Sequence, residues 1–384
     1  MDEIALESTK KLLNYLKDSD LSGYDVNDAL NIPMFENIKS KKLRLAISVF
    51  FRKSPIEFRP FFGMKKGHNP KGMGLFLSAY SRLYAKGILK DHSRATEIYN
   101  WLIENPSKGY GGLCWGYNYP WQNRNRLLPR YTPTVVNTAY VGHGILDYYD
   151  ITKSPDALKM ALSACDFILN DLHITERKEG LCFSYTPLEA DIVYNASALG
   201  ASFLARTASY INKEELLVTA TKAMNFITAH QHSDGRWDYG KDIDSGKVDI
   251  QTDWHQGFIC DSYAWYTESI KKPDKTTQDA LMKGVKFYRD VQFDEHGRCY
   301  RRHPRFWPVN THNQAQGIIT FSRTKNLIPN NQTMVDKILK WTVENMQSKK
   351  EGFFYFEKHP NYMNKINYIR MSQAWMLYAL SWYL

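Results

Sequence analysis

Two histidines and a nearby aspartate are the residues of this chain best suited to moving protons. Asp253 and His255 stand two positions apart, and His312 follows 57 residues after His255. An imidazole changes charge near neutral pH and can act as a general base. Two such bases on opposite faces of a sugar ring permit epimerisation, so we predict His255, His312 and Asp253 as catalytic residues. Two hydrogen-bonded structural histidines are the alternative.

Asp191 offers a second carboxylate that can pair with Asp253. Glycosidases use two carboxylates, roughly 5–5.5 Å apart in retaining enzymes and roughly 6.5–9.5 Å apart in inverting ones. We therefore predict Asp191 as a fourth catalytic candidate. Both aspartates also lie directly before an expected helix, where an Asp side chain can cap free backbone N–H groups. The capping role and the catalytic role both stay open from the sequence.

Aromatic, amide and basic residues gather in the same loops and suit a sugar. Aromatic faces pack against the C–H faces of sugar rings, while amides and arginines bond the hydroxyl groups. Large aromatic residues also fill cores, so each ring has a structural alternative. We predict that Arg124 and Arg130 hold an anionic group and that the whole set binds substrate: Trp115, Tyr117, Trp121, Gln122, Arg124, Arg130, Tyr131, Tyr185, Asn195, Trp254 and Trp307.

A repeated unit carries these residues. Five segments combine a glycine with aromatic residues, and each leads into a helix that opens with a small polar cluster. The clusters begin at intervals of 58, 60, 58 and 59 residues, and a weaker sixth copy surrounds Met73-Gly74. Such regularity indicates a repeat architecture. The segments are 110–117, 179–185, 234–239, 296–300 and 351–355, and the clusters begin at Asn137, Asn195, His255, Asn313 and Ser372.

Each unit contains two helices of different character. The second helix is apolar on nearly every side and must be buried on every side, whereas the first, such as 157–172, is amphipathic. We therefore predict an all-α fold in which six hairpins close into an (α/α)6 toroid; an open superhelix is the competitor. The inner helices are expected to point their first turns at one cavity, beginning near Thr134, Ile192, Asp253, His312 and Tyr368.

Composition narrows the partners. The 384 residues are 43% hydrophobic, with 50 basic and 40 acidic side chains, a net charge of +10 and 5 cysteines. The basic residues are too scattered for a nucleic-acid binder, and the charge instead suits an anionic substrate or a generally basic surface. The sequence has no run of 18 apolar residues, the length that indicates a membrane-spanning helix. We expect a cytoplasmic protein without cofactor or metal, divided into an N-terminal helical extension (1–38) and the toroid (39–384).

Several stretches resemble a family of bacterial and archaeal proteins associated with exopolysaccharide and capsule biosynthesis, some of them labelled prenyltransferase-like. The resemblance covers most of the chain and implies the six-hairpin toroid. More distantly, the chain is similar to N-acylglucosamine 2-epimerases and, at Ala315-Gln316-Gly317, to glucuronyl C5-epimerases. The matching stretches include Asn69-Pro70-Lys71-Gly72, Trp115-Gly116-Tyr117-Asn118-Tyr119-Pro120-Trp121-Gln122, Thr132-Pro133-Thr134-Val135-Val136 and Asp253-Trp254-His255-Gln256-Gly257-Phe258.

These observations together predict a carbohydrate-active protein of surface-polysaccharide biosynthesis that acts on an anionic sugar or glycan. Epimerase, hydrolase and lyase remain open as the reaction class; Arg130, Tyr131 and Tyr185 form the lyase set, with two buried tyrosines preferred as its alternative. A non-catalytic glycan-binding protein on the same toroid is the second hypothesis, because a fold alone does not fix activity. A polyisoprenoid-binding protein is the third, and the polar loops argue against it. The oligomeric state stays open.

Overall fold

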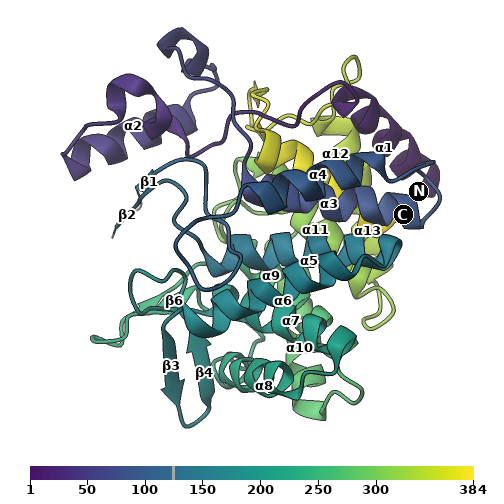
Figure 1. The fold of residues 1–384 in the computed structure, drawn as a ribbon. Helices are drawn as coiled ribbons and strands as arrows, with labels where there is room; N and C mark the ends of the chain where they lie inside the picture. The colour runs from purple at the N-terminus through teal and green to yellow at the C-terminus, as the bar shows by residue number, and fades with distance from the viewer. Residues whose placement is uncertain (123–125) are drawn as a thin grey trace.

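In the computed structural model, which describes residues 1–122 and 126–384, six helices form a closed inner ring (Figure 1). Each of these helices packs against the next, and α13 packs against α3, so the ring closes on itself. The predicted all-α (α/α)6 toroid is confirmed, and the open superhelix is wrong. The inner helices are α3 (Pro70–Ala85), α5 (Val135–Thr152), α7 (Tyr194–Ile211), α9 (His255–Ser269), α11 (Thr311–Arg323) and α13 (Trp375–Tyr383), which follows a π-helical segment, Ile369–Ala374.

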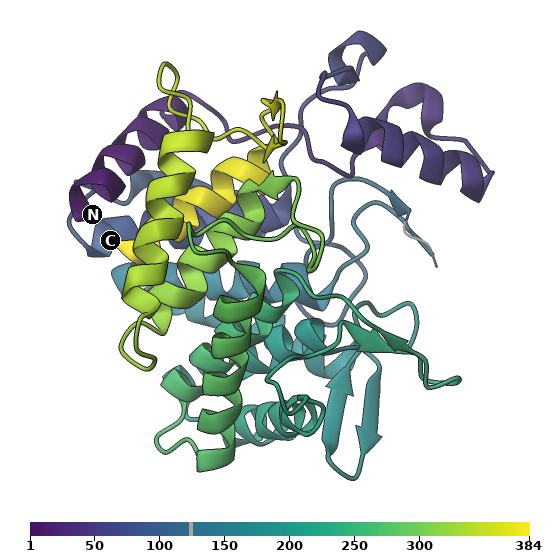
Figure 2. The same cartoon turned by 180° about the vertical axis from the view of Figure 1, so that it is seen from behind.

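Amphipathic helices surround this ring. In α6 the buried side chains include Ala157, Ala161, Ala164 and Ile168, the spacing of one helix face. The N-terminal helix α1 packs against α12 and α13 and takes the sixth outer position (Figure 2). The division at residue 38 stays a prediction. The outer helices are α1 (Asp2–Leu16), α4 (Ser93–Glu104), α6 (Pro155–Asn170), α8 (Glu214–Ala229), α10 (Lys275–Gln292) and α12 (Asn331–Met346).

The same packing contact explains why glycine recurs in each repeat. Each of these glycines lies against the backbone of the next outer helix. A Cβ on Gly112 would lie 2.2 Å from the carbonyl oxygen of Ser163 in α6. A Cβ on Gly352 would lie 2.5 Å from the carbonyl oxygen of Lys11 in α1. The same approach recurs at three further repeat glycines, Gly180 to α8, Gly235 to α10 and Gly297 to α12. The repeat glycine is therefore the point where one hairpin packs on the following one.

Replacing Gly112 by alanine is expected to lower the free energy of unfolding by about 3 kcal/mol, because the added methyl group overlaps backbone atoms that cannot rotate away. Urea denaturation measures this change. Gly87→Ala is the matched control, since a Cβ at Gly87 would have nothing within 4 Å of it, although the φ there is +71°. The control should lose about 1 kcal/mol. Equal losses in the two variants would contradict the packing role of Gly112.

One member of each polar cluster ties the preceding loop to the inner helix. The amide of Trp115 donates to Thr138 Oγ1 (3.3 Å), and the amide of Trp237 donates to Gln256 Oε1 (3.1 Å). The equivalent bonds join Phe183 to Ser197, Cys299 to Gln314 and Phe354 to Gln373. One residue of each polar cluster is thus structural. The neighbouring residues of the cluster do not take part in this bond.

Short antiparallel strands join the loops around the first turns of the inner helices. One sheet has the order β5-β6-β7 and another the order β10-β9-β8, while β1-β2 and β3-β4 form two-stranded pairs. Their bounds are β1 (Trp121–Gln122), β2 (Leu127–Leu128), β3 (Ile174–Arg177), β4 (Gly180–Phe183), β5 (Ile192–Val193), β6 (Gly240–Lys241), β7 (Val248–Asp249), β8 (Val309–Asn310), β9 (Glu357–Lys358) and β10 (Met363–Asn364).

Residues 33–66, here called the arm, project from the same end of the ring (Figures 1 and 2). The arm contains α2 (Lys41–Lys53) between the 3₁₀ turns Pro33–Phe35 and Arg59–Phe62, and a third such turn, Ala29–Asn31, precedes it. A small hydrophobic core separate from that of the toroid joins Phe51 and Met64 of the arm to Tyr368 at the start of the last inner helix.

Candidate active site

Three aromatic side chains from alternate inner helices meet on the axis of the toroid. The centroids of Tyr140 (α5), Phe258 (α9) and Trp375 (α13) lie 5.2–5.8 Å apart. We call these three residues the aromatic floor. Side chains three residues earlier on each helix share the same face, one turn nearer the N-terminus. His255 stands at that position on α9, so it faces the space above the floor.

Lys71, in the first turn of α3, lies on the floor. Its Nζ is 4.5 Å from the ring centroid of Tyr140, 5.2 Å from that of Phe258 and 5.3 Å from that of Trp375. No described atom accepts a hydrogen bond from this amine. Burial lowers the pKa of Lys71 well below its ordinary value, and the charge of Arg370 lowers it further. The amine is therefore available to donate a hydrogen bond to a bound ligand.

His312, in the first turn of α11, borders the same floor. Its ring centroid is 4.5 Å from that of Trp375 and 5.7 Å from that of Phe258. The residue is 3% exposed, and neither ring nitrogen has a hydrogen-bond partner among the described residues. Burial first, and then the charges of Lys71 and Arg370, lower the pKa of His312 well below 6.5. His312 is thus a neutral imidazole with two unused nitrogens.

His255 is held by the carboxylate two residues before it. Its Nδ1 lies 2.6 Å from Asp253 Oδ1, and Asp253 is completely buried. With the ring proton on Nδ1 and donated to Asp253, Nε2 keeps its free lone pair. A carboxylate that accepts from one ring nitrogen in this way orients a catalytic imidazole. Trp254 lies between the two histidines, with its centroid 5.0 Å from that of His255 and 5.4 Å from that of His312. The structure therefore brings His255, His312, Asp253 and Trp254 together.

A cluster of aromatic side chains lies beside this group. We call its members, Tyr117, Tyr119, Trp121 and Tyr185, the wall. Tyr117 stacks on Tyr119 with centroids 5.1 Å apart, and Trp121 lies 6.2 Å from Tyr117 and 6.3 Å from Tyr185. The guanidinium of Arg370 lies 5.2 Å from the ring centroid of Tyr117. The predicted Tyr117, Trp121 and Tyr185 thus cluster with one another.

Arg370 is fixed by a bidentate pair with Asp25 from the N-terminal loop. Its Nε donates to Asp25 Oδ2 at 2.6 Å and its Nη2 donates to Oδ1 at 2.8 Å. The hydroxyl of Tyr119 donates to Asp25 Oδ1 at 2.9 Å. Burial alone would raise the pKa of Asp25, but Arg370 outweighs it and the pKa lies below the ordinary value. Asp25 is therefore ionised and locks the wall in place.

Further polar groups at the first turns lack partners. Both side-chain atoms of Asn137, Oδ1 of Asn195 and Oγ of Ser372 are buried and make no hydrogen bond with a described residue. Asn137 precedes Tyr140 of the floor by three residues on α5, so it shares the inward face. Buried polar groups are normally satisfied. A set of unsatisfied groups at one end of the ring suits a ligand rich in hydroxyl groups.

Other predicted residues have local partners at the rim. Asp191 Oδ2 accepts a bond from Arg126 (2.5 Å) and its Oδ1 accepts the amide of Tyr185 (2.7 Å), so this carboxylate is already held. Gln122 Oε1 accepts a bond from Arg44 of the arm (2.8 Å). Of the remaining four, Arg130 pairs with Glu36, Tyr131 is 52% exposed, Trp307 packs on Phe306, and Arg124 lies outside the described residues.

The position of Trp115 does not fit the predicted contact with substrate. Its side chain is completely buried, and its Nε1 donates to the carbonyl oxygen of Leu102 at 3.0 Å. Trp237 makes the same bond to Ile227, at 2.9 Å, two repeats later. The glycine-aromatic pattern around Trp115 suggested a binding loop, but the indole fastens that loop to the preceding outer helix.

Replacing Trp115 by phenylalanine is expected to lower the free energy of unfolding by about 1–2 kcal/mol, because the carbonyl of Leu102 loses its buried donor. Chemical denaturation measures the loss. Trp121→Phe is the control, since the Trp121 indole is partly exposed at the wall; its stability should change by less than about 0.5 kcal/mol. A larger loss from Trp121→Phe than from Trp115→Phe would reverse this assignment.

Lys71, Arg370 and Asp25 are site residues that the sequence did not predict. A lysine in the first turn of an otherwise apolar inner helix is a usable signal, because burying an ammonium is costly without a functional reason. Arg370 stands in the π-helical segment that leads into α13 and offers the same signal. Asp25 lies in an irregular segment, and no periodicity relates it to the repeat.

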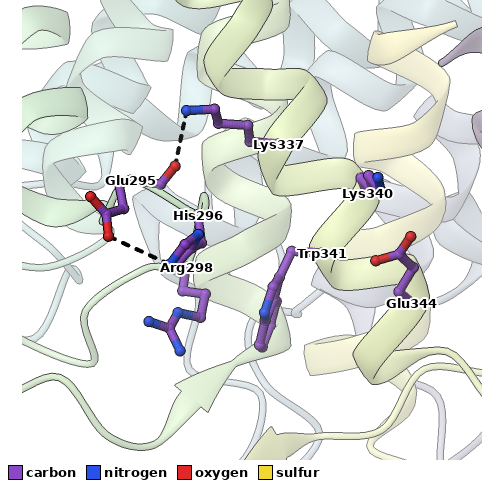
Figure 3. Close-up of a pocket in the computed structure, with 7 residues that line it drawn as sticks. All are labelled: Glu295, His296, Arg298, Lys337, Lys340, Trp341 and Glu344. Atoms are coloured by element: carbon purple, nitrogen blue, oxygen red, sulfur yellow. Dashed lines mark hydrogen bonds and ion pairs between the residues drawn. The ribbon is translucent and has the colours of Figure 1, made fainter.

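A separate hollow of about 360 Å³ lies on the outer surface and is open to solvent (Figure 3). Lys337 Nζ donates to the carbonyl oxygen of Glu295 across it, at 2.9 Å. None of Lys71, His255 and His312 borders this hollow, so it is distinct from the candidate site. Its lining is Glu295, His296, Arg298, Lys337, Lys340, Trp341 and Glu344.

Solved structures with the same fold include three whose names state an activity on sugars or glycans. A cellobiose 2-epimerase from Bacillus thermoamylovorans is 12% identical and aligns over 99% of each chain, with a TM-score of 0.69. An unsaturated glucuronyl hydrolase specific for heparin is 13% identical over 100% of this chain and 97% of its own, with a TM-score of 0.63. An α-mannanase from Bacteroides thetaiotaomicron is 12% identical over 82% of this chain and 86% of its own, with a TM-score of 0.62.

At these identities the likeness establishes the fold alone. The expected likeness to sugar epimerases is confirmed at that level, and the link to exopolysaccharide proteins stays a prediction. No protein-family model matches the chain, and no curated protein does so either. Among the described residues, no helix has the length and apolar character needed to cross a membrane.

Proposed function

We propose that the chain is a sugar epimerase or isomerase that moves a proton at the carbon next to the carbonyl of an open-chain sugar. The observation that carries this proposal is the pair of imidazoles at the first turns of α9 and α11. His312 has two unpartnered nitrogens among the described residues, and His255 is oriented by Asp253. Both rings contact Trp254 and Phe258, so one sugar above the floor reaches both.

The proposed reaction needs no net oxidation or reduction. One imidazole takes the proton from the carbon, and the electrons of the broken C–H bond form an enediolate. In epimerisation the second ring, His255 in its protonated form beside Asp253, then delivers its Nε2 proton to the opposite face of that carbon, and proton exchange with solvent returns both rings to their starting states. In isomerisation the proton returns to the neighbouring carbon instead. Lys71 stands beside His312 and donates a hydrogen bond to the developing oxyanion, a stabilisation that is strong in a water-excluded site.

A hydrolase with two carboxylates has less support. A glycosidase acid needs a raised pKa and room for a substrate beside it. Asp191 is bound to Arg126, and Asp253 is bound to His255. Burial raises the pKa of Asp28 and that of Asp261 to about 7, but Asp28 pairs with Arg59 and Asp261 accepts bonds from Gln316 and Thr320 inside the ring.

An anionic sugar fits the charge of the site. Lys71 and Arg370 both lie close to His312 and lower its pKa. Among the described hydrogen-bond partners of Arg370, the one carboxylate is that of Asp25. A uronate or a phosphorylated sugar would supply the balancing negative charge. We extend the proposal to an intermediate of surface-polysaccharide biosynthesis, and complementation of polysaccharide production in cells lacking the native copy tests that part.

Solvent deuterium incorporation tests the reaction. The full-length protein is incubated in deuterated water with neutral aldoses, uronic acids and short oligosaccharides that have a free reducing end. Transfer through an enediolate places one deuterium on the carbon that exchanges, and mass spectrometry together with NMR locates it. Incorporation that depends on the protein supports the proposal, with uronic acids expected to react fastest.

Three other outcomes would each replace the proposal. Release of a new reducing end without deuterium on carbon identifies a hydrolase. An unsaturated product that absorbs in the ultraviolet identifies a lyase. Calorimetric binding of a glycan with neither exchange nor cleavage identifies the non-catalytic glycan-binding protein.

A further inference from the structure

The arm exposes large apolar side chains at an unusual density. Phe61 is 81% exposed, Met34 65%, Ile56 58% and Phe50 56%. On α2, Phe51 is the only fully buried side chain, although an amphipathic helix of a globular protein normally buries a whole stripe. Single exposed apolar residues need no explanation, but a contiguous group marks an interaction surface.

Ring contacts show that this group is contiguous. Phe50 stacks on Phe58 with centroids 5.9 Å apart and lies edge-on to Phe51 at 5.5 Å. Phe62 lies 5.9 Å from both Phe51 and Phe35. The buried members belong to the small core of the arm, and the outer members, Phe50 and Phe62, continue that core to the surface. Phe61 is the sequence neighbour of Phe62. We call Phe50, Ile56, Phe61 and Phe62 the apolar tip.

The arm that carries the apolar tip is also rich in exposed lysines. Six of them are exposed in the arm: Lys39, Lys41, Lys42, Lys53, Lys65 and Lys66. None forms an ion pair with a described carboxylate, and the one exposed acidic residue of the arm, Glu36, pairs with Arg130 instead. Aromatic rings next to unpaired basic side chains form a surface complementary to an anionic lipid bilayer, where rings enter the interface and ammonium groups meet the headgroups.

We propose that the arm docks the protein on an anionic membrane surface, with the apolar tip in the interface and the six lysines on the headgroups. Charge complementarity favours a bilayer over a second copy of this chain, because two copies joined through the same patch would bring two sets of six lysines together. The arm also contacts the candidate site: Arg44 of α2 donates to Gln122, the residue after Trp121 of the wall. Docking therefore places the wall next to the membrane.

Vesicle co-sedimentation of the full-length protein tests this proposal. The vesicles are pure phosphatidylcholine or phosphatidylcholine with 30% phosphatidylglycerol, at about 0.1 M salt. Binding is expected only to the anionic vesicles and should weaken at higher salt, as screening requires. A variant with glutamine at Lys41, Lys42, Lys65 and Lys66 should lose about fivefold in partitioning per lysine, since each contributes about 1 kcal/mol near the surface. The pair Phe50→Ser and Phe61→Ser should lose about tenfold per ring.

Matched variants control for lost charge and lost apolar surface. Glutamine at Lys271, Lys272, Lys349 and Lys350 removes the same charge from exposed positions outside the arm. Val218→Ser with Met282→Ser removes apolar surface from α8 and α10, where these side chains are both 47% exposed. Both controls should bind like the wild type.

Three results overturn the proposal: no binding of the wild type to anionic vesicles, equal binding to both vesicle types, or an equal loss in the control variants. Light scattering that gives twice the chain mass, restored to one chain by Phe50→Ser and Phe61→Ser, would assign the apolar tip to a second copy instead. Circular dichroism on each variant confirms that folding is retained before its binding is interpreted.

Discussion

Replacing His312 by glutamine is expected to lower deuterium exchange at the sugar carbon by about 10²–10⁴-fold, the usual contribution of a general acid or base. The side chain is buried and has no hydrogen-bond partner among the described residues, so the loss comes from chemistry and not from a broken contact. His255→Gln should show a loss of the same order, because the amide cannot replace a basic Nε2. Both variants should keep the thermal unfolding midpoint within a few degrees.

His296→Gln is the matched control, because its side chain is 62% exposed beside the outer hollow. It should exchange at the wild-type rate. If His255→Gln and His312→Gln also retain full exchange, the two histidines are structural and the proposed mechanism is wrong. Loss in one variant only would reduce the mechanism to a single base, with the second proton supplied by another group.

The pH profile gives an independent readout for His312. Burial and the charges of Lys71 and Arg370 lower its pKa below the ordinary 6.5, so the imidazole stays neutral and basic into mildly acidic solution. The acid limb of kcat/KM that His312 controls should therefore fall below pH 6.5. An acid limb well above that pH would show that the essential base is a different group.

Replacing Asp25 by alanine is expected to lower the free energy of unfolding by about 3–5 kcal/mol, because it leaves Arg370 charged and buried without its partner. Asp25 is 3% exposed and Arg370 is 4% exposed, so water cannot replace the lost contact. The hydroxyl of Tyr119 loses its acceptor as well. Urea denaturation of the wild type and the variant measures the difference.

The double variant Asp25→Leu with Arg370→Met separates the pair from its parts. Removing both charges should cost less than the sum of the two single changes, because neither buried charge is then left alone. Additive costs would show that Asp25 and Arg370 act independently. Lys286→Ala, at an exposed pair with Asp290 on α10, is the surface control and should cost no more than about 1 kcal/mol.

Asp25 also predicts how stability depends on pH. The pKa of Asp25 is lowered in the folded chain, because Arg370 outweighs the cost of burial. The stabilisation is therefore complete above the unfolded pKa, near 4, and is lost as pH falls below that value through the folded pKa. Asp25→Asn should remove this part of the acid dependence, which denaturation at several pH values measures.

The architecture, and the end of the toroid at which the candidate site lies, follow from the sequence alone. Apolar inner helices must be buried on every side, amphipathic outer helices must cover them, and five polar clusters near 59 residues apart place their first turns in register. That register brought His255 and His312 toward one space, because helices that repeat in the same direction present equivalent residues at the same end.

Tertiary structure decided which residues of each cluster face that space. A polar residue at the start of an inner helix either accepts the amide of its own loop, as Gln256 does, or points inward, as His312 does, and the two choices look alike in sequence. Trp115 and Trp121 are equally aromatic, yet only the first has its indole bound within the core. Lys71, Asp25 and Arg370 meet only when the first and last inner helices close the ring, since 345 residues separate Asp25 from Arg370. A contact that forms only when the ring of helices closes cannot be predicted from local periodicity in the sequence.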